Sequence, residues 1–196
     1  MNGTSSDGMT PRTAKDVPAA HGGTTYVMQP GDTLYLVARR FGIRLSDLIS
    51  ANPHVEDLIS VDAGVSLEIP SATDKVRRDK SKGVRCLMMH PGRAAQKADG
   101  VIILDYRKDW IGVLAHGLPA PSHFSGEAYK VWMRNSVTGG YDIALLYPTP
   151  GGAWAARMEA RSPLSNYDAA FVTAESLYND EKPVGPVVIS AGFGHE

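Results

Sequence analysis

The chain is almost without cysteine, since Cys86 is the only one among its 196 residues. A single thiol excludes an intrachain disulfide. Its histidines and acidic residues form no HExxH or other metal-ligand motif. We therefore expect neither a structural metal site nor a cofactor.

Charge of one sign and long apolar runs are also lacking. Twenty basic residues balance 21 acidic ones, so the net charge of -1 gives no reason to expect nucleic-acid binding. No apolar run approaches the roughly 18 residues of a membrane-spanning helix. Residues 1–23 are polar and lack the apolar core of a secretory signal peptide, so we expect a disordered N-terminal tail.

What the chain does contain begins at Tyr26. Tyr26 to Met28 is prone to form a strand, and Pro30-Gly31 ends it with a turn. Asp32 or Thr33 can cap a following helix. The apolar residues of that helix follow helical spacing at Leu34, Val37, Ala38 and Phe41.

A second helix and a return strand follow. Gly42 suits the end of the first helix, and Ser46 predicts the start of the next. Asn52-Pro53 ends this second helix. Val65, Leu67 and Ile69 then alternate as a strand. The predicted order is strand, helix, helix, strand, which is a small α+β unit.

Residues 24–70 resemble a LysM domain. The resemblance rests on Pro30-Gly31-Asp32-Thr33-Leu34, Phe41-Gly42, Ala51-Asn52-Pro53 and the closing Ile69-Pro70, in the family's order and spacing. It implies a βααβ fold and binding to peptidoglycan or a chitin-like oligosaccharide of N-acetylglucosamine. It also implies a glycan groove between the loop before the first helix and the loop after the second. The groove residues in this chain would be Gly31, Asp32, Thr33, Leu34, Pro53, His54, Val55 and Ile59.

Residues 71–83 form a basic segment after this unit. Six basic residues against two acidic ones occupy positions 71–85. The plain interpretation is a solvated linker, and the alternative is a site for an anionic polymer or an acidic partner. With few apolar groups in the linker, we expect the two flanking domains to fold independently and to move relative to each other.

Residues 84–196 differ from the first unit in their sequence pattern. Eight short β-prone runs are separated by turn signals such as Asp99-Gly100, Thr138-Gly139-Gly140 and Pro150-Gly151-Gly152. The runs cover residues 85–89, 101–105, 110–115, 128–134, 141–147, 153–159, 168–174 and 186–190. No strong amphipathic helix interrupts them, so we predict an all-β, Ig-like antiparallel β-sandwich.

This half resembles the C-terminal domain of anti-sigma-K factors of the RskA type. The resemblance spans about residues 85–193 and rests on motifs that begin at Gly117, Ala128, Phe171 and Pro183. These motifs are mostly structural. The sigma-binding domain and membrane helix of that family are not recognisable here, so the resemblance implies a fold rather than sigma regulation.

Candidates for catalysis in this half are few. Cys86 lies in a predicted strand without the surroundings of a catalytic thiol, which favours a small core residue. His90, His116 and His123 could converge on a metal, although no motif supports it. Four carboxylates lie on separate strands or loops and indicate no acid pair. They are Glu127, Asp142, Glu159 and Glu175.

Trp132 leaves two alternatives open. It alternates with Tyr129, Val131 and Met133, which share the opposite face of the predicted strand. Either a loop covers Trp132 or the indole marks an exposed interaction surface.

The sequence therefore predicts a non-enzymatic, glycan-binding protein of the cell envelope or of the spore surface, with the β-domain as an adaptor for a protein partner. One alternative is a peptidoglycan-remodelling enzyme with an unrecognised active site in the β-domain. An anti-sigma-like signalling protein is the third. The absence of a recognisable signal peptide and of disulfides favours the spore surface, where LysM proteins meet cortex peptidoglycan without secretion. The alternatives are a signal peptide that has been removed, another export route, and thus a secreted wall protein.

Overall fold

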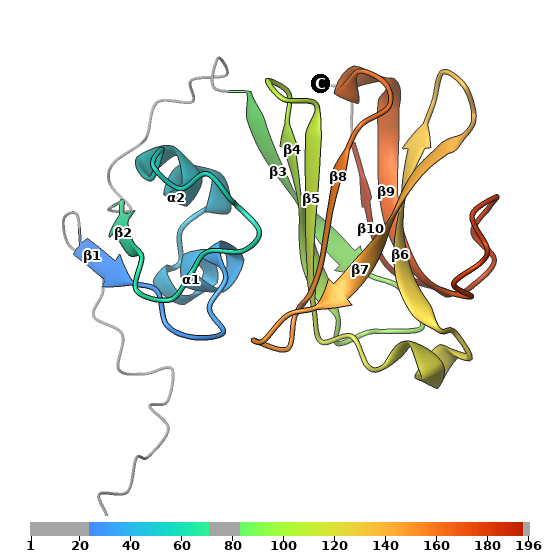
Figure 1. Ribbon diagram of the computed structural model, residues 1–196, viewed down its shortest axis with the longest axis horizontal. Helices are drawn as coiled ribbons and strands as arrows, with labels where there is room; N and C mark the ends of the chain where they lie inside the picture. The colour runs from blue at the N-terminus through green and yellow to red at the C-terminus, as the bar shows by residue number, and fades with distance from the viewer. Residues whose placement is uncertain (1–23, 71–82, 194–196) are drawn as a thin grey trace, which may run out of the picture.

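The structure is a computed structural model that describes residues 24–70 and 83–193. The predicted tail (residues 1–23) and nearly all of the predicted basic linker lie outside the described residues. Figure 1 shows two units side by side, a small one with two helices and a larger one made of strands.

The N-terminal unit has the predicted βααβ order. Its elements are β1 (Thr24–Val27), α1 (Leu34–Phe41), α2 (Leu45–Ala51) and β2 (Ser66–Ile69). β1 and β2 pair antiparallel, with Tyr26 opposite Leu67. Thr33 caps α1 by accepting a hydrogen bond from the Leu36 amide at 3.2 Å, and Gly42 ends it in the left-handed conformation. α2 begins one residue before the predicted Ser46 start.

Asn52 joins the two halves of this unit. Its buried amide Nδ2 donates to the carbonyl oxygens of Leu48 and Glu68, both at 2.8 Å. Its Oδ1 accepts from the Glu68 amide at 2.7 Å. The side chain therefore satisfies the end of α2 and the edge of β2 together.

The larger unit contains all eight predicted strands. In chain order they are β3 (Val84–Pro91), β4 (Asp99–Asp105), β5 (Trp110–His116), β6 (Ala128–Asn135), β7 (Tyr141–Pro148), β8 (Trp154–Glu159), β9 (Tyr167–Glu175) and β10 (Val187–Gly192). Two short 3₁₀ helices lie between strands, η2 (Pro121–Phe124) and η3 (Leu164–Asn166).

These strands close into an antiparallel barrel with the order β10-β3-β4-β5-β8-β7-β6-β9. The prediction of an Ig-like β-sandwich is therefore wrong. Two short pairings close the barrel. His90 and Pro91 on β3 pair with β10, and Tyr147 and Pro148 on β7 pair with β8. Alternating hydrophobicity and turn signals predict strands, but they do not reveal whether edge strands meet.

The barrel interior is the main hydrophobic core. Tyr129, Val131 and Met133 of β6 point into it, which confirms the predicted alternation. Trp132 lies on the other face and is fully buried. Its indole Nε1 donates to Thr173 Oγ1 at 2.7 Å. Of the two alternatives, burial under a loop is the correct one, as the polar network described below shows.

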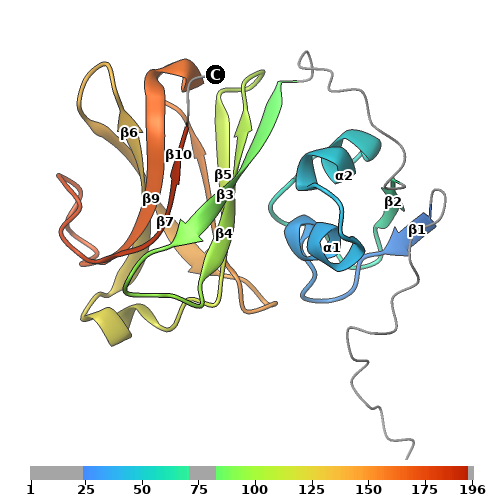
Figure 2. The same ribbon diagram turned by 180° about the vertical axis from the view of Figure 1, so that it is seen from behind.

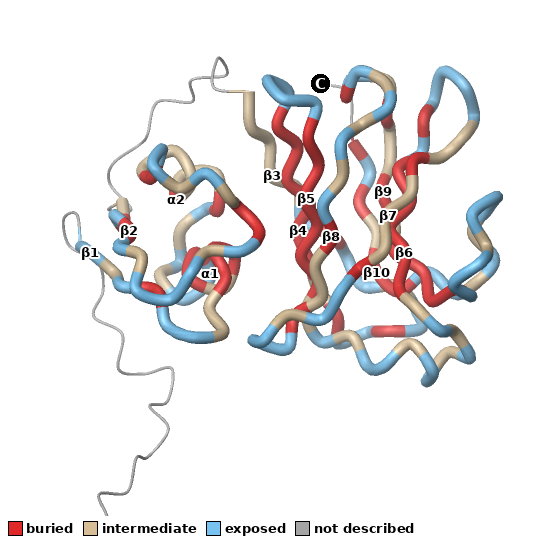
Figure 3. Tube along the Cα trace, in the orientation of Figure 1, coloured by how far each residue is buried: buried red, intermediate tan, exposed pale blue. Residues whose placement is uncertain are grey.

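A second hydrophobic cluster spans both units. The outer side of β4 and β5 contributes four buried side chains, here called the docking face. They are Val101, Ile103, Trp110 and Leu114. α1 and α2 lie between the β1–β2 sheet and this side of the barrel, as the front and back views both show (Figures 1 and 2). Buried positions run along β4 and β5 where they face α1 (Figure 3). The two units thus share an apolar cluster across their contact, which the expectation of independently folding domains did not include.

Candidate functional site

The β1–α1 loop is fixed by the carboxylate of Asp32. Asp32 Oδ2 accepts from the Tyr26 hydroxyl at 2.5 Å and from the Gln29 amide at 2.9 Å. Arg40 Nη2 donates to Asp32 Oδ1 at 3.1 Å, and Arg40 also donates to the Tyr26 hydroxyl. Burial, followed by the hydrogen bond to Asp32, raises the pKa of Tyr26. Asp32 therefore holds the loop in shape, and Thr33 acts as the helix cap.

Gly31 gives this loop its turn. Its φ of 85° lies in the left-handed region that favours glycine. Thr33 and Leu34, by contrast, are buried. Gln29 and Pro30 are exposed and Gly31 and Asp32 are half-buried, so the first part of this loop is the part nearest to solvent.

The α2–β2 loop has an exposed end and a buried end. Pro53 and His54 are exposed, and His54 Nε2 lies 3.1 Å from the Ser66 carbonyl oxygen. Val55 is half-buried and Ile59 is buried. Asp57 Oδ1 accepts from the amides of Ile59 at 2.9 Å and Ser60 at 3.1 Å, which fixes the buried end.

The residues predicted to bind glycan thus fall into an exposed group and a group that lies against the barrel. Pro53 and His54 are open to solvent, whereas Gly31 and Ile59 lie against the barrel. The sequence did not single out Tyr26, Arg40 and Asp57, which shape the two loops. The Asp57 turn had a signal, because aspartate commonly accepts hydrogen bonds from amides two and three residues later.

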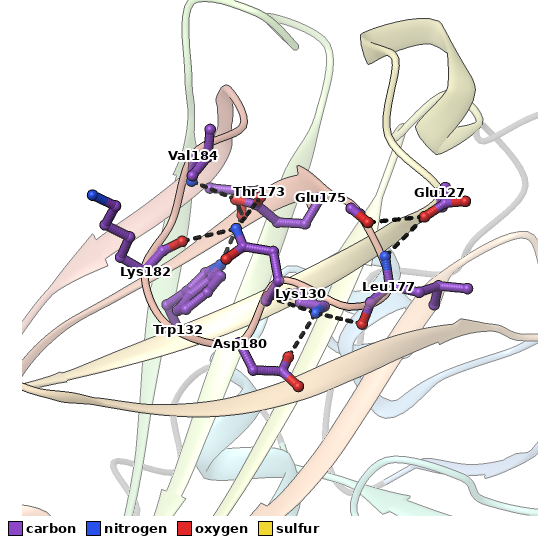
Figure 4. A network of polar contacts seen from close by, with 11 residues as sticks. Glu127, Lys130, Trp132, Thr173, Glu175, Leu177, Asp180, Lys182 and Val184 are labelled. Carbon is purple, nitrogen blue, oxygen red and sulfur yellow. Dashed lines mark hydrogen bonds and ion pairs between the residues drawn. The ribbon is translucent and has the colours of Figure 1, made fainter.

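The most buried charge of the barrel is Lys130, and it is fully paired (Figure 4). Its Nζ donates to the carbonyl oxygens of Leu177 at 2.9 Å and Asn179 at 2.7 Å, and it pairs with Asp180 Oδ1 at 2.7 Å. These three acceptors belong to the segment between β9 and β10. Lys130 therefore anchors that segment over β6 and keeps Trp132 covered.

Glu175 anchors the other end of the same segment. Its Oε1 accepts from Thr173 Oγ1 at 2.7 Å and from the amides of Val184 and Gly185, both at 2.9 Å. Asn179 Nδ2 donates to Oε2 at 3.0 Å. Burial tends to raise the pKa of Glu175, but these donors outweigh it and hold the pKa below its usual range. Since Lys130 and Glu175 are both engaged by the protein, the network supports a structural role.

The catalytic candidates are placed as follows. Cys86 packs beside the second hydrophobic cluster, and burial raises the pKa of its thiol to about 12, so little thiolate forms near neutral pH. His116 stacks on Tyr35, and His123 lies edge-on to Phe124. In the ranges 24–70 and 83–193, no three His, Cys, Asp or Glu residues form a group that could hold a metal ion.

The carboxylates are mostly held by the protein. Glu127 Oε2 accepts from the Leu177 amide at 3.0 Å and from Ser176 Oγ at 3.1 Å. Asp142 Oδ2 accepts from the Tyr167 hydroxyl at 2.5 Å and from the Arg161 amide at 2.8 Å. Together with Glu175, they support the structure of loops and strand ends.

A cavity of about 490 Å³ lies where the two units meet. α1 and the turn after it form one wall, and β3 and β4 form the other. Arg39 and Asp99 line it and form an ion pair across it, with Nη1 2.5 Å from Oδ2.

The LysM domain family matches residues 26–70. This segment is a LysM domain. No curated protein and no solved structure matches the chain. The LysM match stops before the barrel, and nothing supports the resemblance of residues 85–193 to the RskA C-terminal domain. No helix within the described parts of the chain is long and apolar enough to cross a membrane.

A LysM domain is a binding module for glycans of the peptidoglycan and chitin type. Its presence therefore indicates that this chain binds such a glycan. It also indicates a protein that works at a cell wall or outside the cell.

Proposed function

We propose that the chain is a non-enzymatic receptor for N-acetylglucosamine polymers and that the LysM β1–α1 and α2–β2 loops bind the sugar. The observation that carries this is the match of residues 26–70 to LysM, joined to the hydrogen bonds that hold both loops. Asp32 fixes the first loop and Asp57 fixes the second, each by accepting backbone hydrogen bonds. Preformed loops bind with a smaller loss of conformational entropy.

The backbone supplies the chemistry of this site. Amide and carbonyl groups around Gly31 can hydrogen-bond the acetamido group of a sugar, since glycine lets the ring approach closely. Pro53 and His54, both exposed, offer apolar contact and a polar ring at the open end of the site. Val55, which is half-buried, and Ile59, which lies against the barrel, would complete the apolar lining for the acetamido methyl once the loop is free of the barrel.

Binding by one module is expected to be weak. Without avidity from further modules, the Kd should lie on the order of micromolar to millimolar. Longer oligomers should bind more tightly because they offer more overlapping sugars to the same loops.

The test is a titration of the full chain with N-acetylglucosamine oligomers of increasing length, followed by the amide chemical shifts of both loops. Amide shifts that change at Gly31, Asp32, His54 and Val55 support the proposal. Unchanged shifts at millimolar hexamer would refute it. Incubation with purified peptidoglycan separates receptor from hydrolase, because a receptor sediments with the polymer and releases no muropeptides.

We propose further that the barrel is an adaptor for a protein partner and that the chain works in the cell envelope or on the spore surface. The stiff β9–β10 segment supports the adaptor role, because it exposes Leu177, Tyr178 and Val184 on a hydrogen-bonded frame. A fluorescent fusion of the full chain should ring the developing spore. A diffuse signal throughout sporulation would reject the spore surface.

A further inference from the structure

The tip of the β7–β8 hairpin touches the LysM domain at the proposed sugar site. A Cβ added to Gly151 would lie 2.2 Å from the Gly31 carbonyl oxygen, and one added to Gly31 would lie 3.2 Å from Gly151 Cα. The two backbones are therefore in direct contact, with no room for a side chain between them. Gly31 is the residue at which a sugar ring would have to approach most closely.

The second loop of the proposed site also lies on the barrel. Asp57 Oδ2 is 3.3 Å from Arg157 Nη1 of β8. Ile59 packs over β5, where a Cβ on Gly112 would lie 2.5 Å from Ile59 Cδ1 and 2.6 Å from Trp110 Cη2. Both sugar-binding loops are thus engaged by one side of the barrel, formed by β5, β8 and the β7–β8 hairpin.

Within the described parts of the chain, three buried polar atoms at this contact have no protein partner within normal hydrogen-bond geometry. Among the described residues, the buried side-chain nitrogen and oxygen atoms without a hydrogen-bond partner are Tyr35 Oη, Trp110 Nε1 and His116 Nε2. All three lie where the LysM domain meets the barrel. Tyr35 stacks on His116 at 5.4 Å between ring centroids, and its hydroxyl lies beside Arg39 and Asp99 without a hydrogen bond of normal geometry. Trp110 belongs to the docking face.

Unpaired buried donors and acceptors weaken an interface, since water would pair them if the surfaces separated. The two ion pairs across the contact, Arg39–Asp99 and Arg157–Asp57, are largely exposed and add little. The apolar docking face holds the two units together. The polar atoms of Tyr35, Trp110 and His116 favour their separation, because water could then pair with them. Such a balance suits a contact that opens and closes.

We infer that the barrel masks the LysM sugar site and that a glycan and the β7–β8 hairpin compete for the Gly31 loop. This inference rests on the proposed sugar site. In the closed arrangement the hairpin occupies the position of a sugar at Gly31, and of the proposed site residues only Pro53 and His54 are exposed. A polymer binds fully once the hairpin has moved away. The affinity of the full chain is then reduced by the fraction of molecules that are open.

Gly151→Ala tests this on the full chain. The added methyl would overlap the Gly31 carbonyl oxygen, so it should displace the hairpin without entering the barrel core. Gly140→Ala is the matched control, because it lies in the β6–β7 hairpin and its Cβ would meet only Thr138 Oγ1, at an ordinary 3.5 Å. The probe is the N-acetylglucosamine hexamer, measured by calorimetry. Acrylamide quenching of tryptophan fluorescence reports opening, because Trp110 becomes accessible.

The expected result is stronger quenching and at least a threefold lower Kd for Gly151→Ala, with Gly140→Ala equal to the wild type. Gly112→Val is a second variant that should act in the same direction through Ile59. Equal hexamer affinity in the wild type and in an opened variant would overturn the masking while leaving the sugar site standing. No hexamer binding by any opened variant would overturn both. Unchanged quenching in both variants would show that the contact does not open, which also refutes the inference.

Discussion

Among single residues, Asn52 links two elements of the LysM domain that lie apart in the sequence. Its side chain makes three hydrogen bonds that join the end of α2 to β2. The sequence predicted Asn52 only as part of a helix stop. Asn52 also bonds to Glu68 of β2. The sequence pattern around Asn52 could not predict this bond, because it does not show which strand lies beside the end of the helix.

Asn52→Ala should lower the free energy of unfolding by about 1–3 kcal/mol, because a buried amide and two buried carbonyl groups lose a partner. Chemical denaturation of the full chain measures the loss. Asn52→Asp is the comparison variant. It keeps the acceptor for the Glu68 amide, but its buried carboxylate would face the carbonyl oxygens of Leu48 and Glu68, so its loss at neutral pH should be at least as large as that of the alanine variant. A neutral effect of the alanine variant would contradict this role.

Asp32 shows what residue patterns predict and what they leave open. The motif Pro30-Gly31-Asp32-Thr33 predicted a turn and a helix cap, and both are present. Sequence left the choice of cap open, and Thr33 is the cap. The reason is that Asp32 is engaged by Tyr26 and Arg40, which lie in β1 and at the end of α1. The role of Asp32 thus depends on contacts between separate elements, which the sequence pattern does not show.

At the scale of elements, the β9–β10 segment is held by buried groups rather than by strand pairing. Lys130 binds one side of it and Glu175 the other (Figure 4). A lysine that is only 1% exposed would be costly without its three acceptors. The segment and the lysine therefore stabilise each other.

Lys130→Met should loosen this segment. The change removes three hydrogen bonds, while Asp180 stays solvated, so the free energy of unfolding should fall by about 1–3 kcal/mol. Hydrogen exchange of residues 176–186 should speed up more than exchange in β6. Lys182→Met is a matched control, since that side chain is exposed in the same segment. Equal exchange in the two variants would contradict the anchoring role.

The strands themselves were predictable, and their closure was not. All eight runs form strands with bounds within a few residues of those expected. The barrel closes at β3–β10 and β7–β8, where only short stretches pair. The sequence does contain one sign that a second unit covers the outer face of the barrel. The continuous apolar runs in β4 and β5 are typical of strands buried on both faces, and the outer face is the one that receives the LysM domain.

At the scale of the whole molecule, the contact between the units should depend on pH through His116. Burial lowers its pKa, with Arg39 acting in the same direction, Asp99 opposing, and Tyr35 stacked on the ring. In the closed arrangement the half-buried ring therefore gives up its proton more readily than a freed ring, which would titrate near its ordinary 6.5. The closed arrangement is fully favoured above that value. It weakens as the pH falls through 6.5 toward the lowered pKa, since the open form binds the extra proton.

Acrylamide quenching of tryptophan should thus increase between about pH 7 and about pH 5 in the wild type. His116→Gln removes the titrating group and should flatten this profile. A wild-type profile without any slope, or an equal slope in the variant, would rule out His116 as the cause. Hexamer affinity should rise over the same range if masking controls the sugar site.

The docking face also limits how the LysM domain can be deleted or exchanged. Four buried side chains would meet water if the LysM domain were deleted, namely Val101, Ile103, Trp110 and Leu114. A truncated barrel would then carry an adhesive surface and tend to aggregate. A foreign LysM domain grafted in its place would need a matching surface, together with a glycine opposite Gly151. The two parts of this protein are therefore expected to have changed together during evolution rather than to have been shuffled as separate units.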